Sequence, residues 1–387
     1  MSQSNAIVVL KAFGNDYSAI QSDVILPQLL SRMDQRTPLL RTVHIDQDDV
    51  AMNRGDVLTI PKPQYIEDVR YQTSAPSVSE DLSVETVKCE LSEHIYVEGQ
   101  FGDREAAATM AGYVPDALAA MVDALSRKLN RSVVEKFKEI SNVSGILDSQ
   151  NERTKRDLIN AREAMNKLKV HEDKTLALSG ETAGEILGIL TAGSDSKREV
   201  EGNIGRVFGF DPVEDNMVGV HEAGSASEDA SIVTAISTAA GSPVLAISGA
   251  SADATFKRGD ILYVAGTKQT FAVAADVVAD ETGAASVYVT EGARTAIPAG
   301  AAVRVAGDHR QDTAYHQSAI VMAFRQLKPI ADQKNATISM MSHPETGMPL
   351  RMATWYEPKT YMTHVKIDTL YGIVVAAPER ALRMGGH

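Results

Sequence analysis

One long amphipathic helix constrains this chain more than any other feature. Between residues 115 and 143, apolar side chains recur every three or four positions, the spacing of one face of an α-helix. The stripe consists of Leu118, Met121, Leu125, Leu129, Val133, Phe137 and Ile140. Pro115 and Asp116 suit a first helical turn, and at about 1.5 Å per residue the helix is roughly 40 Å long. Such a stripe could bind a cofactor or a membrane, but we interpret it as the core-facing side of a structural helix.

The segments before this helix carry little apolar surface. Residues 1–45 form an irregular arm, interrupted by Pro27 and Pro38, with only short apolar groups. Residues 46–100 are typical of an extended two-stranded loop, because alternating apolar residues flank a polar tip. Neither segment can form a core of its own, since apolar burial must offset the entropy lost on ordering. Both should therefore lie on another surface.

A compact α/β region is expected next, over residues 150–221. Thr154–Leu168 has a helical pattern, and Ser179 can cap a second helix that ends at Leu190. Thr175–Leu178 is typical of a short buried strand, and Arg206–Phe210 is predicted to be another strand.

Residues 222–308 change in character, since Gly, Ala, Val and Thr dominate and strand-like pieces recur between turns. The pieces are Val244–Ile247, Ile261–Val264, Thr270–Val273, Ser286–Thr290 and Val303–Val305. This spacing is typical of a small β barrel or sandwich. Helical sequence is expected to resume near Tyr315, so we interpret the β region as an insertion whose ends lie close together. Residues 336–387 return to β, with strands predicted at Ile338–Met341, Leu350–Tyr356 and Tyr361–Val375.

The sequence contains only weak matches to catalytic or metal-binding motifs. The 9 histidines show no metal-ligand spacing. Ser194-Asp195-Ser196-Lys197 matches a signature of penicillin-interacting enzymes, but it lies in a polar stretch without that family's partner motifs. The single cysteine, Cys89, is expected to be a reduced thiol in a strand. No apolar run approaches the roughly 20 residues that span a bilayer, and no secretory leader is recognised. We therefore expect no catalytic residue, no cofactor, no metal ligand and no enzymatic activity.

The net charge of the chain and the distribution of its basic residues indicate how it could interact with DNA. Lys and Arg number 38, and Asp and Glu number 51, which gives a net charge of −13. One local basic cluster consists of Arg127, Lys128, Arg131, Lys136 and Lys138. Because acidic residues share its helix, we interpret it as a solvated or subunit-facing surface rather than a sequence-specific DNA site. An acidic wall could still enclose DNA, since mild repulsion prevents the DNA from adhering.

The order of these elements resembles the Hong Kong 97-type capsid fold of tailed double-stranded DNA bacteriophages. The stretches that carry the resemblance are Gly205–Asp211 with Val213–Asn216, Tyr315–Ala319, and Val365–Val374 followed by Pro378-Glu379. Within the β region, Phe256–Gly266 and Gln269–Val273 are similar to the inserted β domain of short-tailed-phage coat proteins. The chain is identified as resembling their major capsid protein.

The resemblance implies an α+β chain with seven parts. They are an N-terminal arm (1–45), an extended β loop with a peripheral-domain strand (46–100), a peripheral domain with the spine helix (101–149), an apical domain (150–221), an inserted small β barrel (222–308), the return of the apical domain (309–335) and the peripheral-domain sheet (336–387).

It also implies a structural role. The chain would self-assemble, through hexamers and pentamers, into an icosahedral shell around the phage genome. Its partners would be other copies of itself, a scaffolding protein, a portal, and packaged double-stranded DNA held by non-specific proximity, with no membrane. Assembly would take place in the cytoplasm of the host bacterium, and the protein would reside in the virion.

The residues suggest where copies would touch. Because the arm and the loop are expected to lack a core of their own, we predict that Leu29, Leu30, Leu39 and Leu40 pack on an adjacent subunit. Glu67, Asp68 and Arg70, at the tip of the loop, would set the register. Two alternatives are an encapsulin-like nanocompartment shell, which would load enzyme cargo, and a carbohydrate-binding protein. The latter would need exposed rings in the insertion, where the aromatic residues are Phe256, Tyr263, Phe271 and Tyr288.

Overall fold

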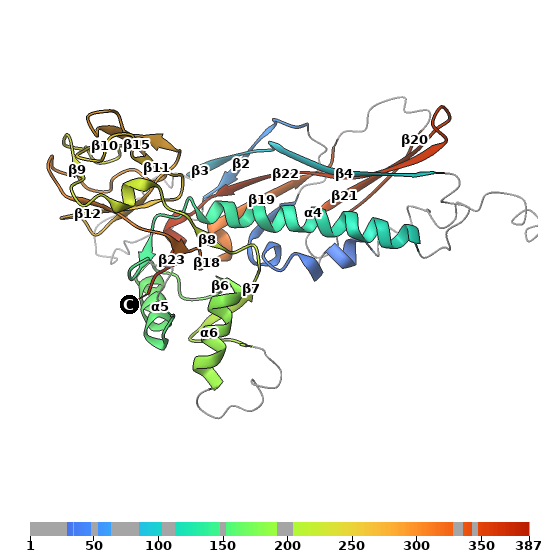
Figure 1. The fold of residues 1–387 in the computed structure, drawn as a ribbon. Coiled ribbons are helices and arrows are strands. Elements are labelled where there is room, and N and C mark those ends of the chain that lie inside the picture. Colours follow the sequence, from blue (N-terminus) through green and yellow to red (C-terminus); the bar gives the residue numbers. More distant parts are fainter. Residues whose placement is uncertain are drawn as a thin grey trace, which may run out of the picture.

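The computed structural model describes residues 29–33, 35–47, 53–62, 85–102, 113–147, 152–191, 204–327, 336–342 and 347–386. Over these residues the fold is mixed α+β (Figure 1). One long helix runs along an extended sheet, with a smaller α/β body and a β-rich lobe near the C-terminal end of the helix.

The extended sheet is built around its longest strand, β22. The sheet contains β1 (His44–Gln47), β4 (Glu93–Gly102), β19 (Ile320–Arg325), β20 (Ala336–Ser342), β21 (Pro349–Glu357) and β22 (Met362–Val375). Along one edge, β22 pairs antiparallel with β21 and then β19, and along the other edge with β4. β20 continues the sheet beyond β21, and β1 lies parallel to β19. The three strands predicted after residue 336 are therefore confirmed.

The helix predicted over residues 115–143 is α4 (Tyr113–Phe137), which ends six residues earlier than expected, so the stripe residue Ile140 lies just beyond it. All seven stripe residues are buried, with at most 9% of their surface exposed. They share one hydrophobic cluster with side chains of β4 and β22. Residues 29–33 and 35–43, here called the N-terminal segment, belong to the same cluster and include the short 3₁₀ helix η2 (Leu40–Thr42). α4 thus lies between the sheet and the N-terminal segment (Figure 1).

The α/β body contains a five-stranded sheet and two helices. The strands, in sheet order, are β5 (Val143–Ser144), β23 (Ala381–Met384), β18 (Thr313–His316), β6 (Lys174–Leu178) and β7 (Phe210–Glu214). The helices are α5 (Lys155–Lys167) and α6 (Gly180–Thr191). Thr154 and Asp157 form a capping box at the start of α5. The Ser179 hydroxyl accepts from the backbone N–H of Thr182, so the predicted cap of α6 is confirmed.

Two predictions in this body are wrong. Arg206–Phe210 is a tight turn rather than a strand, because Phe208 and Gly209 have φ angles of 49° and 85° and Val207 and Phe210 exchange backbone hydrogen bonds. The strand begins at Phe210. The chain near Tyr315 is not helical: β18 is followed by the 3₁₀ helix η4 (Gln317–Ala319) and then β19. Hydrogen bonds from β6 and β23 on both sides hold Tyr315 in a strand.

The β lobe, residues 220–310, has a hydrophobic cluster of its own that includes Phe256, Phe271 and Val287. Its elements are β8 (Val220–His221), η3 (Ser225–Glu228), β9 (Val233–Thr234), β10 (Val244–Ser248), β11 (Thr255–Phe256), β12 (Ile261–Val264), β13 (Thr270–Ala272), β14 (Val277–Val278), β15 (Ala285–Tyr288), β16 (Val303–Val305) and β17 (His309–Arg310). The five predicted strand pieces correspond to β10, β12, β13, β15 and β16. β9, β10 and β15 form one sheet, and β12, β13 and β16 another.

A hairpin of β2 (Val57–Pro61) and β3 (Thr86–Glu90) lies against the extended sheet. Ile60 and Cys89 pack there with Leu370 of β22. Cys89 is a free thiol and only 1% exposed, which confirms the prediction of a reduced thiol in a strand. Burial raises the pKa of this thiol to about 11. The remaining 3₁₀ helix, η5 (Pro378–Arg380), precedes β23.

Candidate functional site

The four leucines that we expected to touch a neighbouring subunit are buried by their own chain. Leu29 and Leu30 are 4% and 2% exposed, and Leu39 and Leu40 are 0% exposed. All four pack in the cluster of the α4 stripe. The prediction that they pack on an adjacent subunit is therefore wrong, because such side chains have almost no surface to offer. The physical reason is that α4 is apolar on two sides, and the second side supplies the surface that the N-terminal segment needs.

Polar contacts fix the position of the N-terminal segment. Asn130 of α4 donates to the backbone carbonyl of Arg36 (3.1 Å) and to the carboxylate of Asp215 (2.8 Å). The hydroxyls of Thr42 and Tyr315 lie 2.6 Å apart. Asn130 was not among the predicted site residues, although a polar residue four positions after Ser126, within an apolar pattern, was a usable signal. Both residues are buried.

Other residues singled out from the sequence lie outside the described ranges. Glu67, Asp68 and Arg70 are among them, as are Ser194 and Lys197. Within the described ranges, no group of three or more His, Cys, Asp or Glu side chains is arranged to hold a metal ion. A search of the same residues finds no helix with the length and apolar character needed to cross a membrane.

α4 packs on one face of the extended sheet, and the hairpin of β2 and β3 covers the opposite face around Leu370. The part of this opposite face that carries Tyr96 is exposed. Val97 and Ile367 point toward α4, so the alternate residues of β4 and β22 point away from it. On this open face the ring of Trp355 stacks on His364 with centroids 5.1 Å apart, and the Lys366 ammonium lies 4.3 Å from the centroid of Tyr96. We call Tyr96, Trp355, His364 and Lys366 the open face. Tyr96 is 58% exposed, and exposed aromatic rings are enriched at protein interfaces.

The same sheet also has two open edges. Among the described strands, β4 pairs only with β22, and β20 pairs only with β21. β4 contains 10 residues and β20 contains 7. Unpaired backbone N–H and C=O groups along such an edge can accept a strand from another chain. The sheet can therefore associate through its edges as well as through its open face.

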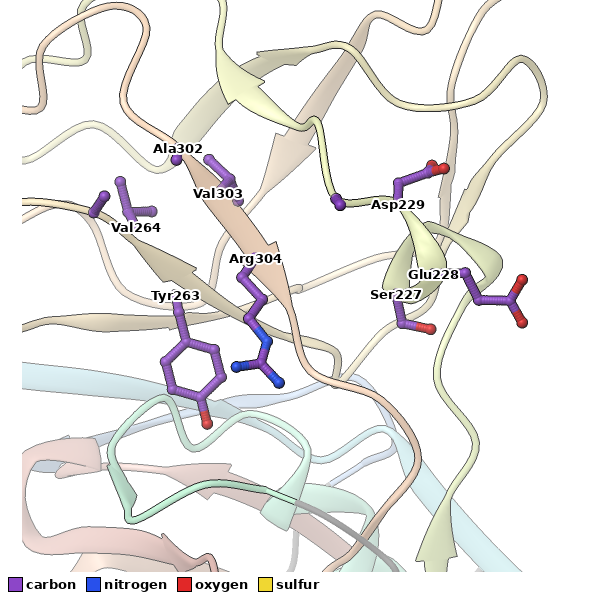
Figure 2. A pocket seen from close by; sticks show the side chains of 10 residues that line it. Ser227, Glu228, Asp229, Tyr263, Val264, Ala302, Val303 and Arg304 are labelled. Carbon is purple, nitrogen blue, oxygen red and sulfur yellow. The ribbon is translucent and has the colours of Figure 1, made fainter.

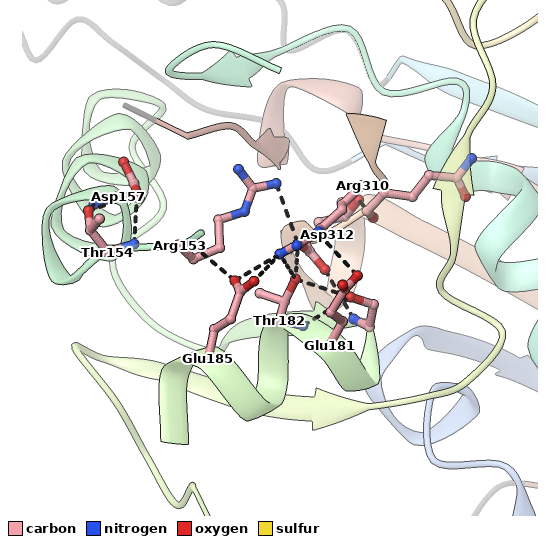
Figure 3. A network of polar contacts seen from close by, with 11 residues as sticks. Arg153, Thr154, Asp157, Glu181, Thr182, Glu185, Arg310 and Asp312 are labelled. Atoms are coloured by element: carbon pink, nitrogen blue, oxygen red, sulfur yellow. Dashed lines mark hydrogen bonds and ion pairs between the residues drawn. The ribbon is translucent and has the colours of Figure 1, made fainter. Parts of the chain in front are cut away.

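A buried polar network ties α6 to Arg310 of β17 and to Asp312, which lies between β17 and β18 (Figure 3). The carboxylate of Asp312, 0% exposed, accepts from the Ser179 backbone N–H (3.0 Å) and the Thr182 hydroxyl (2.7 Å). Arg310 donates to both carboxylate oxygens of Glu185 at 2.8 Å. Burial raises the pKa of Asp312. Because both oxygens of Asp312 have partners and neither contacts solvent, the network is suited to holding elements together rather than to proton transfer with a substrate.

A second buried cluster joins the β lobe to the α/β body. The Arg383 guanidinium donates to the carbonyls of Gly259 (2.7 Å) and Lys138 (2.6 Å), and it lies 3.2 Å from Nε2 of His309. Arg can only donate, so Nε2 must accept and Nδ1 carries the proton. Nδ1 then donates to the carbonyl of Gly307 (2.8 Å). Burial, with the Arg383 charge as the next cause, lowers the pKa of His309 to about 3.

A hollow of about 490 Å³ lies in the β lobe between η3 and β12 and β16. Figure 2 shows Tyr263 and Arg304 on one wall and Ser227, Glu228 and Asp229 on the other. A carbohydrate site would need exposed rings for stacking. Of the aromatic residues expected to provide them, Phe256 and Phe271 are 0% exposed, while Tyr288 is 55% exposed. The hollow itself contains one aromatic ring, the half-buried Tyr263, and this does not favour carbohydrate binding.

Comparison with known proteins gives matches only at the level of three-dimensional structure. No known family model and no curated protein matches the sequence. The capsid of a native GTA particle aligns over 91% of this chain and 90% of its own, with 8% identity and a TM-score of 0.46. The capsid of Cyanophage P-SCSP1u aligns over 89% and 86%, with 10% identity and a TM-score of 0.44. A virus-like particle from Pyrococcus furiosus aligns over 92% and 94%, with 10% identity and a TM-score of 0.42. These three structures are two capsids and a virus-like particle.

Proposed function

We propose that this chain is a shell subunit, which self-assembles into an icosahedral capsid around the double-stranded DNA genome of a phage. The observation that carries the proposal is the extended sheet, which has two open edges and an open face among the described residues. A sheet of this kind is incomplete alone, because long unpaired edges favour pairing with another chain. Identical copies would present the same edges and faces to one another, as closed symmetric assemblies require.

The internal packing of the described body supports the same proposal. α4 is held by the extended sheet and the N-terminal segment, while buried polar clusters hold α6 and the β lobe in place. A shell subunit needs such a fixed shape, because many weak contacts must repeat with the same geometry before the shell closes. The burial of the N-terminal leucines moves the proposed contacts between copies from the arm to the sheet.

The finer features of the proposal follow from the resemblance of the sequence to phage coat proteins. Hexamers and pentamers would form the shell, a scaffolding protein and a portal would take part in its assembly, and assembly would precede release of the virion from the bacterial cytoplasm. The β lobe would correspond to the inserted β domain, and Glu67, Asp68 and Arg70 would contact a neighbouring copy.

Electron microscopy of the purified full-length chain tests the proposal. We expect closed shells of uniform diameter in negative stain. Tyr96→Ser, on the open face, should raise the protein concentration needed for assembly, whereas Tyr288→Ser, a similarly exposed tyrosine on the β lobe, should not. A chain that stays monomeric at every concentration and ionic strength tested would refute the proposal. Shells from the native source that protect enzyme cargo instead of DNA would identify a nanocompartment.

A further inference from the structure

Five cationic side chains gather on one side of α4 and the N-terminal segment. They are Arg32, Arg36, Arg127, Lys128 and Arg131, here called the basic face. All five belong to exposed residues. The described carboxylate of Asp123 lies among them: it accepts two hydrogen bonds from Arg32, both 2.9 Å, and lies 3.9 Å from Nε of Arg36. Among the described residues, the five cations outnumber this carboxylate, on a chain whose total charge is −13.

The basic face differs from the rest of the helix surface. Toward the end of α4 the cations are neutralised within the chain, since Lys136 lies 2.7 Å from Glu139 and Lys138 lies 3.1 Å from Glu135. By contrast, no carboxylate of the described residues lies within 4 Å of Arg127, Lys128 or Arg131. Like charges this close repel one another. An anion from outside the chain would remove that repulsion.

The chemistry of the surface indicates which anion. Arg127 and Arg131 are one turn apart, about 6 Å along the helix, and Ala120 and Ala124 continue the same face. A protein partner would need an apolar or aromatic anchor at the centre of its interface, and alanines do not supply one. A phosphate backbone needs only exposed cations, because the release of its counterions provides the binding free energy.

We propose that the basic face binds the phosphate backbone of nucleic acid without regard to sequence. The inference rests on the proposed function, in which packaged DNA would lie against this side of the subunit. The net charge of −13 keeps the remaining surface repulsive, so contact is confined to one side and remains weak. Weak contact suits a genome that must be packaged and released.

Fluorescence anisotropy of a labelled 30-base-pair duplex with unassembled full-length subunits tests the inference. The wild type should bind with a dissociation constant between about 10⁻⁶ and 10⁻⁴ M, and the affinity should fall with salt. Arg127→Glu/Lys128→Glu/Arg131→Glu should weaken binding about a hundredfold at low salt. It should also reduce the slope of log K against log salt by about 2.7, which is 0.9 for each lost phosphate contact.

The matched control is Lys155→Glu/Lys268→Glu/Lys359→Glu, which reverses three exposed charges outside α4 and the N-terminal segment. Both triple variants have the same net charge, so only the basic-face variant should lose duplex binding, and both should form shells. Equal binding by the two variants, or no binding by the wild type, would overturn the inference. So would a loss of shells in the basic-face variant alone, because the face would then be a contact between copies. A wild type that binds duplex but never forms shells would refute the proposed function and leave the binding result intact.

Discussion

His309 allows a quantitative test of the junction between the β lobe and the α/β body. Its ring is 0% exposed, its Nε2 accepts from Arg383, and its Nδ1 donates to the carbonyl of Gly307. Protonation of Nε2 would remove the acceptor and place a second cation beside Arg383. The folded state therefore holds the pKa of His309 at about 3, below the ordinary value of 6.5. His309→Gln keeps an acceptor for Arg383 but removes the titration.

The sign of the effect follows from proton linkage. Between pH 6.5 and about 3, the unfolded chain binds a proton at His309 and the folded chain does not. The stabilisation is complete above pH 6.5 and is lost as the pH falls, by about 1.4 kcal/mol per pH unit. At pH 5 the loss is about 2 kcal/mol. The variant avoids this loss, but it gives up the hydrogen bond to Gly307, which costs about 1 kcal/mol at every pH.

We therefore expect the free energies of unfolding of wild type and variant to cross near pH 6. His309→Gln should be less stable by about 1 kcal/mol at pH 7 and more stable by about 1 kcal/mol at pH 5. Urea unfolding of unassembled subunits, followed by circular dichroism, measures the difference. Hydrogen exchange of peptides that contain β17 and β23 reports the same opening locally. His171→Gln, at an exposed position, should show no crossing. A constant difference between wild type and His309→Gln across this range would refute the reasoning.

Two further predictions concern the packing of the hairpin on the extended sheet. A Cβ at Gly372 would lie 2.4 Å from the carbonyl oxygen of Glu90, so Gly372→Ala should cost about 3 kcal/mol of unfolding free energy in urea titrations. Gly188→Ala, where no atom lies within 4 Å, should instead stabilise α6 by about 0.5–1 kcal/mol, and equal effects at the two sites would contradict this geometry. Cys89 is buried with its pKa raised to about 11, so a disulfide reagent at pH 8 should modify it at least about a hundredfold faster in urea than in buffer. Rapid modification of the folded protein would show that the hairpin does not cover the thiol.

Helices and strands could be predicted from the sequence where apolar residues recur at a regular spacing or a capping residue is present. These local patterns are the stripe of α4, the Thr154 and Ser179 caps and the alternation in β22. Each of these elements is present, although α4 ends at Phe137 rather than at residue 143. Ile320–Arg325 could not be assigned in this way. All six residues of this strand are buried, and a continuous apolar run fits a buried strand or a buried helix equally well. Backbone pairing with β22 and β1 makes this segment a strand, and its own sequence does not reveal that pairing.

The clusters that hold the parts together were beyond sequence reasoning for a different reason. Lys138, Gly259, His309 and Arg383 meet at one point, although long stretches of chain separate them. No motif spacing connects such residues. The error over the N-terminal leucines has the same origin, since the apolar surface that covers them belongs to a helix about 80–100 residues later. A segment that lacks a core in its own sequence can obtain one from a distant part of the same chain.

That correction changes where contacts between copies should be sought. Had the leucines been exposed, the N-terminal segment would have been the natural contact, and removing it would have disabled assembly alone. Since they are buried with α4, removing them would expose the apolar side of the helix and destabilise the subunit itself. If the truncated chain failed to assemble, the cause could be its lower stability, so the failure would not show that the removed segment contacts another copy. Surface changes that leave every buried cluster intact, such as Tyr96→Ser on the open face, separate assembly from folding, because Tyr96 is 58% exposed and lies on the side of the sheet away from α4.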